Sequence, residues 1–204
     1  MTIRLHRGDL PDLTRYTGAV AVDTEAMGLD AHRDRLCVVQ LSPGDGSADV
    51  VQIGREIGPA PNLKRLLADP AKLKIFHLAR FDLAMLSQWL GVMPQPVYCT
   101  KIASRLTRTY TDKHGLKDLT KDLLGKDISK QQQLTDWGAE ALTEAQVAYA
   151  AEDVLNLHAL KDKLDVMLAR EGREELAAAC FAFLPSRARL DLAGWAADDI
   201  FAHS

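Results

Sequence analysis

Two carboxylates stand one residue apart in the stretch VAVDTE, residues 20–25, at the end of a run of apolar side chains. Side chains two positions apart on a strand project to the same face, so we expect Asp23 and Glu25 to point together. An ionised carboxylate in a dry core is costly unless a partner neutralises it. The pair therefore indicates either a strand that ends in solvent or a site that holds a cation.

Two further acids occur among apolar residues. Asp82 lies in the stretch HLARFDLAML, early in a predicted helix, where the positive end of the helix dipole favours an acid even without a function. Asp153 follows Tyr149 by four residues on another predicted helix, so their side chains share one face. Each of these acids is weak evidence alone, and the weight of the pattern comes from their number.

The four acids form a set of hard oxygen ligands without a thiolate or imidazole cluster beside them. Mg²⁺ and Mn²⁺ prefer such ligands. Two ions of this kind about 4 Å apart accelerate in-line phosphoryl transfer, and the phenol of Tyr149 can orient the attacking water. The pattern predicts a two-metal phosphoryl-transfer site, and the alternative is a set of solvated, unrelated acids.

Strands are predicted for the first third of the chain. Apolar runs at residues 18–23, 35–41 and 48–53 are separated by polar or turn-forming sequences such as SPGDGS. Short turns between successive strands favour an antiparallel meander. The first of these runs brings Asp23 to its end.

Helices dominate the rest of the chain. Apolar spacing predicts a helix after Pro59, a helix over residues 79–90 and two short helices within residues 101–125. Thr143 begins a capping box, from which we predict one long helix that runs to about Leu168. Strands followed by helices predict a single α/β or α+β domain with a mixed sheet.

Composition excludes several classes of protein. Of the 204 residues, 47% are hydrophobic and 26% are charged, which is typical of a globular domain rather than a disordered chain. A secretory leader and an apolar run of about 18 residues are both missing from the sequence, which predicts a cytoplasmic protein. The three cysteines lack metal-ligand spacing and are predicted to be reduced thiols.

The formal net charge of −3 argues against a protein that grips a long nucleic-acid backbone, because such proteins carry a basic surplus. An enzyme that binds one or two phosphates needs few basic residues. Within residues 101–130 lysines and arginines outnumber acids, which indicates either a modest basic face or a solvated helix surface.

Two parts of the chain are expected to have different roles. We expect the catalytic domain to span residues 1–184 and a C-terminal tail to follow at residues 185–204. Apolar side chains in this tail, including Trp195 and Phe201, are expected to pack on their own domain or, alternatively, against another subunit.

The motifs resemble a known family. VDTE, the FD of HLARFDLAML, and YAAED are similar to the three motifs of the DEDD 3′-to-5′ exonucleases. A tyrosine four residues before the last Asp resembles the DEDDy branch, which ribonuclease D typifies. The similarity extends over roughly residues 19–165 and includes ISKQQQLTDW. Within the family, stretches such as CTKIASRLTRTYTDKHGLK and DIFAHS most resemble the short, stand-alone nanoRNase C group.

This resemblance implies an α/β, RNase H-like fold with a mixed sheet flanked by helices in a single domain. It implies that two divalent cations, Mg²⁺ or Mn²⁺, are bound by the four acids Asp23, Glu25, Asp82 and Asp153. Tyr149 would position the water that attacks the 3′-terminal phosphodiester. The nanoRNase C group further implies a ring-shaped homo-octamer. Ribonuclease D also has helical HRDC domains, and we expect none in a chain of this length.

The resemblance also predicts residues that touch the substrate. Thr24 lies within the first motif, and Leu29 resembles an apolar wedge between the last two bases, although a loop leucine is commonly packing. His77 matches a position that often faces substrate, and the alternative is a hydrogen-bonded core histidine. Lys130 resembles a family lysine that offsets charge developing at the scissile phosphate, and the alternative is a plain surface lysine.

Three functions are compared on this basis. The leading hypothesis is a 3′-5′ exoribonuclease that hydrolyses short oligoribonucleotides, especially dinucleotides, to 5′-mononucleotides in the final step of RNA degradation. The nearest alternative is ribonuclease D-like trimming of RNA 3′ ends, or a DNA exonuclease. A non-catalytic nucleic-acid-binding module is the third, and it is disfavoured because such proteins usually lose a metal ligand whereas this chain has all four acids and the tyrosine.

Overall fold

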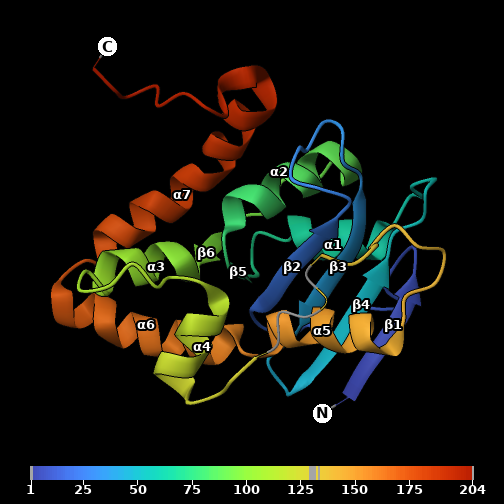
Figure 1. The fold of residues 1–204 in the computed structure, drawn as a ribbon, viewed down its shortest axis with the longest axis horizontal. Coiled ribbons are helices and arrows are strands. Elements are labelled where there is room, and N and C mark those ends of the chain that lie inside the picture. Colours follow the sequence, from blue (N-terminus) through green and yellow to red (C-terminus); the bar gives the residue numbers. More distant parts are fainter. Residues whose placement is uncertain (1, 129–131, 133, 204) are drawn as a thin grey trace.

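A six-stranded mixed sheet forms the centre of the structure (Figure 1), a computed structural model that describes residues 2–128, 132 and 134–203. The strands are β1 (Thr2–Arg7), β2 (Val20–Ala26), β3 (Leu36–Ser42), β4 (Ser47–Gln52), β5 (Lys74–Phe76) and β6 (Val97–Cys99). Their order in the sheet is β1-β4-β3-β2-β5-β6. β2, β3 and β4 pair antiparallel, and the other three pairings are parallel. The predicted meander and the predicted mixed sheet are confirmed.

Two strands of the meander, β3 and β4, are buried along their whole length. Every residue of β3 and of β4 is buried, which agrees with the nearly continuous apolar run of β3, LCVVQLS, whereas β4 also buries the polar residues Ser47, Asp49 and Gln52. β1 was not predicted, because its sequence TIRLHR is polar and mostly exposed. β1 lies at the edge of the sheet and is mostly exposed to solvent, so its side chains need not be apolar.

Seven α-helices follow or separate the strands in the described residues. They are α1 (Pro61–Ala68), α2 (Ala79–Leu90), α3 (Thr100–Thr107), α4 (Leu116–Leu124), α5 (Glu144–Leu155), α6 (Leu157–Glu171) and α7 (Glu174–Leu190). α2 has the predicted bounds and is followed by Gly91, a C-cap residue in the left-handed conformation (φ 66°). The capping box is present, with Gln146 N donating to Thr143 Oγ1 over 3.2 Å. α5 packs against β2, β3 and β4, whereas α2 packs against β2, β3 and β5 (Figure 1).

The single long helix predicted from Thr143 to about Leu168 is wrong. The helix is interrupted at Asn156 (φ −100°, ψ −8°), and α5 and α6 lie on either side of this residue. Asn156 accepts a hydrogen bond from Lys126 Nζ over 3.2 Å. α5 packs on the sheet and α6 packs mainly on α3, so the interruption lets each helix follow its own surface. Local helix propensity is overridden here by tertiary packing.

The C-terminal region extends α7. This helix includes Pro185 and ends at Leu190, so it crosses the expected boundary between catalytic domain and tail. A π-helical turn follows at Asp191–Trp195, and Arg80 pairs with Asp191 over 2.6 Å. Beyond it the chain extends away from the body of the molecule (Figure 1).

The apolar side chains of this tail remain exposed. Trp195 is 47% exposed and Phe201 is 75% exposed, although the Phe201 ring lies 5.8 Å from that of Phe183. Phe201 thus contacts its own chain through Phe183, while much of both tail side chains stays in solvent, and contact with another subunit stays a prediction.

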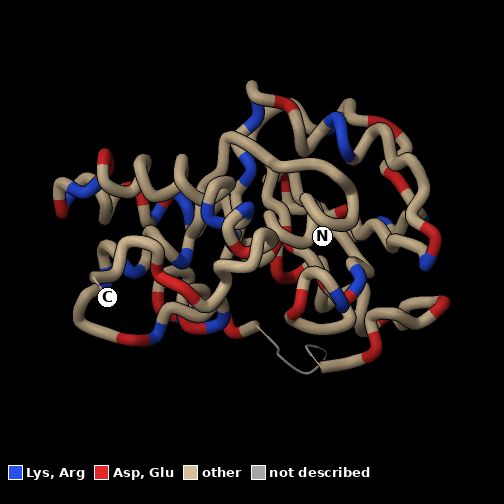
Figure 2. The backbone as a smooth tube through the Cα atoms, turned by 90° about the horizontal axis from the view of Figure 1, so that it is seen from above, with Lys and Arg blue, Asp and Glu red and all other residues tan. Residues whose placement is uncertain are grey.

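Charges of both signs are mixed along the chain (Figure 2). Within residues 101–130, Arg108 pairs with Asp122, and Lys121 lies 3.6 Å from Asp127. Some of the basic residues in this segment are therefore neutralised by neighbouring acids. Among the described helices, none is long and apolar enough to cross a membrane.

Candidate active site

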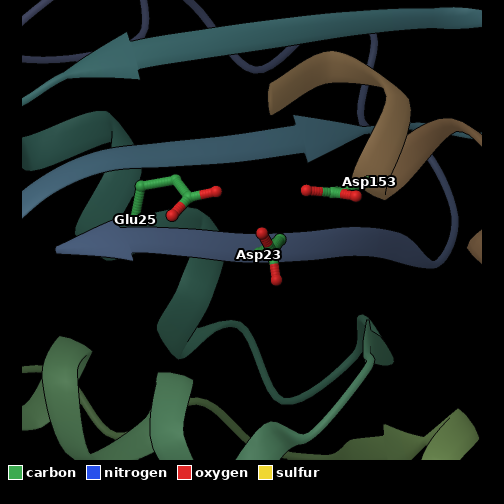
Figure 3. Close-up of side chains that lie close together, drawn as sticks. All are labelled: Asp23, Glu25 and Asp153. Carbon is green, nitrogen blue, oxygen red and sulfur yellow. The ribbon is translucent and has the colours of Figure 1, made fainter. Parts of the chain in front are cut away.

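Three carboxylates meet over the middle of the sheet (Figure 3). Asp23 and Glu25 project from β2, and Asp153 points toward them from α5. One carboxylate oxygen from each residue lies within 4.8 Å of the other two. Asp23 and Glu25 share one face of β2, as predicted, and α5 brings Asp153 to the same face.

The backbone elements hold this arrangement in place. Asp23 lies opposite Gln40 of β3, and the register of β2 and β3 shifts between Glu25 and Ala26, directly after the second acid. On α5, Ala150 and Ala151 are fully buried, so small side chains let this helix lie close to the sheet. The cluster is therefore built on a strand and a helix rather than on a loop.

Asp82, the fourth acid, lies on α2 and is not one of the three carboxylates within 4.8 Å of one another, although its charge acts on Asp23. It is only 2% exposed, and its Oδ1 accepts a hydrogen bond from Thr24 Oγ1 over 2.7 Å. Thr24 lies between Asp23 and Glu25, so its side chain points to the opposite face of β2. Two successive residues of β2 thus act on opposite faces of the strand. Asp23 belongs to the carboxylate cluster, and Thr24 holds the Asp82 side chain.

Burial and mutual repulsion make it unfavourable to ionise these acids. Burial raises the pKa of Glu25 to about 8, and the charges of Asp153 and Asp82 add to this effect. Burial likewise raises the pKa of Asp82 to about 8, against the hydrogen bond from Thr24. The pKa of Asp23 is raised well above its ordinary value by burial and then by its acidic neighbours. Burial and the charge of Glu152 raise the pKa of Asp153 to about 7.

No lysine, arginine or histidine forms an ion pair with any of the four acids among the residues that the structure describes. Carboxylates that lie this close together require a cation to be ionised at the same time. Their oxygens are the ligand type that Mg²⁺ and Mn²⁺ prefer. The donor set of this site therefore fits divalent cations.

Tyr149 lies one helical turn before Asp153. Its ring centroid is 6.0 Å from that of Trp137, which is buried. The Tyr149 hydroxyl opposes the rise in the pKa of the Asp153 carboxyl. Burial and the negative charge of Asp153 raise the pKa of Tyr149 itself, so its hydroxyl keeps its proton. The protonated phenol is available to orient a polar group beside the acids.

The predicted substrate-binding residues lie in different settings. Leu29 follows β2 and is 88% exposed, so it is free to contact a ligand. The His77 ring contacts the Thr100 hydroxyl, with Nδ1 and Oγ1 2.9 Å apart, and burial lowers the pKa of His77 to about 3. This matches the hydrogen-bonded histidine that was the alternative for His77. Lys130 lies outside the described residues.

Gln40 makes a contact that the sequence analysis did not predict. Its Nε2 donates to Asp23 Oδ2 over 3.2 Å. A signal was present, since Gln40 is the one amide within the apolar stretch LCVVQLS of β3. Only the strand register identifies its partner.

The chain matches a family model described as "3′-5′ exonuclease" over residues 10–169. Among curated proteins it is 36% identical over 154 residues to ribonuclease D of Granulibacter bethesdensis, a match that covers 76% of this chain and 38% of that protein. It is 31% identical over 163 residues to ribonuclease D of Escherichia coli, covering 80% of this chain and 43% of that protein. The chain thus spans about two fifths of the length of these curated relatives.

Solved structures give matches over the whole chain. Brucella melitensis NrnC with bound Mg²⁺ is 60% identical, covers 100% of both chains and superposes with a TM-score of 0.96. The same protein bound to pGG is 61% identical, with the same coverage and a TM-score of 0.97. Escherichia coli RNase D is 26% identical, covering 93% of this chain and 51% of that chain, with a TM-score of 0.81. The predicted RNase H-like fold is confirmed.

Proposed function

Because this chain belongs to the 3′-5′ exonuclease family, we propose that it hydrolyses short oligoribonucleotides from the 3′ end to 5′-mononucleotides. Dinucleotides are the preferred substrates in this proposal, and the reaction is the final step of RNA degradation. The resemblance to the DEDD exonucleases and to nanoRNase C that the motifs predicted is confirmed.

One observation carries the proposal: the carboxylates of Asp23, Glu25 and Asp153 lie within 4.8 Å of one another, buried Asp82 acts on Asp23 from α2, and none of the four has a basic partner among the described residues. A site built only for stability would neutralise such charges, because each buried carboxylate left unpaired is costly. The similar NrnC structure bound to pGG supports a substrate of two nucleotides, because it matches this chain from end to end.

Two divalent cations, Mg²⁺ or Mn²⁺, are the proposed cofactors, with Asp23, Glu25, Asp82 and Asp153 as their ligands. Bound cations of this kind supply Lewis acidity at a phosphodiester and stabilise negative charge on the attacking and leaving oxygens. The similar NrnC structure with bound Mg²⁺ supports this choice of ion. Asp23 is proposed to contact both ions.

The other proposed site residues orient the attacking water, contact the substrate or position an acid. Tyr149 orients the attacking water through its hydroxyl, which the raised pKa keeps protonated. Leu29, which is 88% exposed, packs against a terminal base. Thr24 acts mainly through Asp82, since its hydroxyl already donates to that carboxylate. His77 and Lys130 are proposed to lie near the substrate and near the scissile phosphate, respectively.

A substrate-length series tests the proposal. The protein is assayed with 5′-labelled RNA of two to about twenty nucleotides, with Mg²⁺, with Mn²⁺ and with EDTA. We expect dinucleotides to be the fastest substrates and EDTA to abolish turnover. Activity that survives EDTA would refute the two-metal mechanism. Equal rates at all lengths would contradict the preference for dinucleotides.

The same assay distinguishes the alternatives. The curated relatives are named ribonuclease D, which favours RNA 3′-end trimming as the second candidate. That function predicts faster turnover of long structured RNA than of dinucleotides. A DNA exonuclease would degrade duplex DNA at a comparable rate, and a non-catalytic binding module would bind RNA without releasing mononucleotides.

The assembly is a separate part of the proposal. We infer that residues 1–184 form the catalytic domain and that residues 185–204 contribute a subunit contact in a ring-shaped homo-octamer of a cytoplasmic protein. The exposed Trp195 and Phe201 support this contact, since large apolar side chains rarely stay in solvent together. Replacing both with Ser is expected to yield smaller species by light scattering. The matched control is Val166→Ser, an exposed apolar residue on α6, and an unchanged mass in the double variant would refute the contact.

A further inference from the structure

Gln40 is a buried amide within an apolar strand. Its neighbours Val38, Val39 and Leu41 are fully buried, and Gln40 itself has no exposed surface. A primary amide in such surroundings requires hydrogen bonds to replace those it made to water. Its Nε2 donates to Asp23 Oδ2, while its Oε1 meets no hydrogen-bond donor in the described part of the chain. An apolar side chain would fill this position at lower cost, so packing alone does not explain the glutamine.

The contact follows from the register of the sheet. Gln40 and Asp23 are direct partners in the antiparallel pairing of β3 and β2. Side chains of such partners lie on the same face and close together. The amide is therefore held on the Asp23 carboxylate by the backbone pairing of two central strands, not by a flexible loop.

The charge of the donor matters as much as its position. A glutamine amide is neutral, so it orients the carboxylate without cancelling its charge. A lysine or arginine at position 40 would neutralise Asp23 and take the place of a bound cation. Elsewhere in the same sheet, Asp49 is met by the charged Arg15 over 2.8 Å. The neutral amide of Gln40 thus leaves the Asp23 carboxylate able to bind a metal ion.

We propose that Gln40 is a positioning residue whose amide holds the Asp23 carboxylate in the orientation that binds the divalent cations. The inference rests on the proposed function, because it assumes that Asp23 is a metal ligand. Hydrogen-bond partners of ligating carboxylates fix their orientation, and their loss commonly weakens metal binding 10- to 100-fold. Gln40 does not itself touch the substrate or the ions.

Gln40→Met tests this assignment, because methionine has a similar length but cannot donate a hydrogen bond. We expect calorimetry to give about 10- to 100-fold weaker Mn²⁺ binding than in the wild-type protein. In EDTA the variant is expected to melt at the same temperature or higher, because the unpartnered Oε1 is removed. A merely structural glutamine predicts the reverse, namely a lower melting temperature with unchanged Mn²⁺ affinity.

Gln52→Met is the matched control. Gln52 is also a buried strand glutamine with an unpartnered Oε1 among the described residues, but its Nε2 donates to the backbone oxygens of Ala139 and Glu140. Its replacement is expected to lower the melting temperature and to leave Mn²⁺ affinity within about twofold of wild type. Should Gln40→Met fail to fold, Gln40→Leu removes the same donor with the same expected loss of affinity.

Asp23→Asn distinguishes a failure of the positioning inference from a failure of the proposed function. If wild-type protein binds Mn²⁺, Asp23→Asn does not, and both Gln40 variants bind with wild-type affinity, the positioning inference is overturned and the proposed function stands. If wild-type protein binds no Mn²⁺ and hydrolyses no RNA, the proposed function fails and the inference fails with it. Weak Mn²⁺ binding by the Gln40 variants with intact melting behaviour supports both.

Discussion

Asp49 and Asp23 are both carboxylates on strands of one sheet, yet the groups that surround them are opposite in kind. Asp49 accepts hydrogen bonds from Arg15 Nη1 (2.8 Å) and Tyr16 Oη (2.7 Å), and lies 2.9 Å from His6 Nε2. Asp23 lies among other acids, and its described side-chain donor is the neutral Gln40. One carboxylate is surrounded by donors that satisfy it, and the other by groups that repel it.

This difference in partners gives Asp49 a role in stability and Asp23 a role in the proposed reaction. The partners of Asp49 come from β1 and from the segment before β2, so this carboxylate fastens the N-terminal part of the chain to β4. Within the described part of the chain, the acids around Asp23 have no basic partner and are available to bind a cation. Perturbed carboxylates of this kind are concentrated at functional sites, where stability is traded for activity. The same amino acid therefore serves as a structural anchor at one end of the sheet and as a ligand in the middle.

Replacing each aspartate with asparagine gives the sharpest test of this comparison, and the largest effect is expected at Asp23. Asp23→Asn should lower hydrolysis by about 10³-fold or more, because a metal ligand supports several kcal/mol of transition-state stabilisation. Without metal the variant should be at least as stable as the wild type, since a repelling charge is gone. Turnover of labelled dinucleotides and urea unfolding in EDTA measure the two effects. A folded, fully active variant would contradict the site.

Metal addition is expected to have the next largest effect, and it depends on pH. The pKa values of Glu25 and Asp82 are raised to about 8 in the folded protein, far above their ordinary values. Between about pH 4 and pH 8 the folded state therefore binds more protons than the unfolded state, so metal-free stability falls as pH rises. Protons and cations compete for these oxygens.

Mg²⁺ at about 100 times its dissociation constant should add roughly 2.7 kcal/mol of stability at pH 8. For a chain of this size that raises the melting temperature by about 5–10 °C. At pH 5 the shift should be much smaller, because protons already neutralise the acids. Thermal melts with Mg²⁺ and with EDTA at both pH values measure this. The same shift at pH 5 and pH 8 would contradict the linkage to the raised pKa values.

Asp49→Asn is the counterpart of Asp23→Asn and should have the opposite sign. Loss of the charge weakens hydrogen bonds from Arg15 and Tyr16, and bonds to charged groups are worth about 1.5–3 kcal/mol. We expect a loss of about 2 kcal/mol in the free energy of unfolding, with activity of the folded protein nearly unchanged. If Asp49→Asn were stabilising, the view of Asp49 as an anchor would be wrong.

Thr24→Val tests the contribution of the hydroxyl that holds Asp82, and the smallest effect is expected here. Valine keeps the shape of threonine and removes the donor to Asp82 Oδ1. Activity should fall by about tenfold, in line with other partners of ligating groups, while Thr24→Ser should stay near wild type. Steady-state rates at several Mn²⁺ concentrations measure the loss. Equal rates for the valine and serine variants would show that this hydroxyl has no part in the site.

Local patterns predicted much of this molecule. The apolar runs that became β3 and β4, the helix over Ala79–Leu90 and the capping box at Thr143 all depend on residues close in the chain. For the same reason Asp23 and Glu25 could be predicted to share a face, because alternation on a strand is a local property. The break at Asn156 was missed because both flanking sequences favour helix, and only packing separates them.

The partners of each acid depended on strand register. No local pattern indicates that Gln40 faces Asp23, that Thr24 reaches Asp82 across 58 positions, or that β1 pairs with β4. A slip of one residue would turn every one of these side chains to the other face of the sheet. The predicted contact of Thr24 with substrate stays a prediction, and the structure adds that its hydroxyl donates to Asp82.

The sequence by itself determined which acids this protein has, the elements that present them and the family to which their spacing belongs. Only the tertiary structure decided that Asp49 is neutralised while Asp23, Glu25 and Asp153 are left to repel one another. The reason is physical: the side-chain types follow from the chain, but burial and charge partners arise only when distant segments meet. The reactivity of the same carboxyl group is therefore a property of the fold.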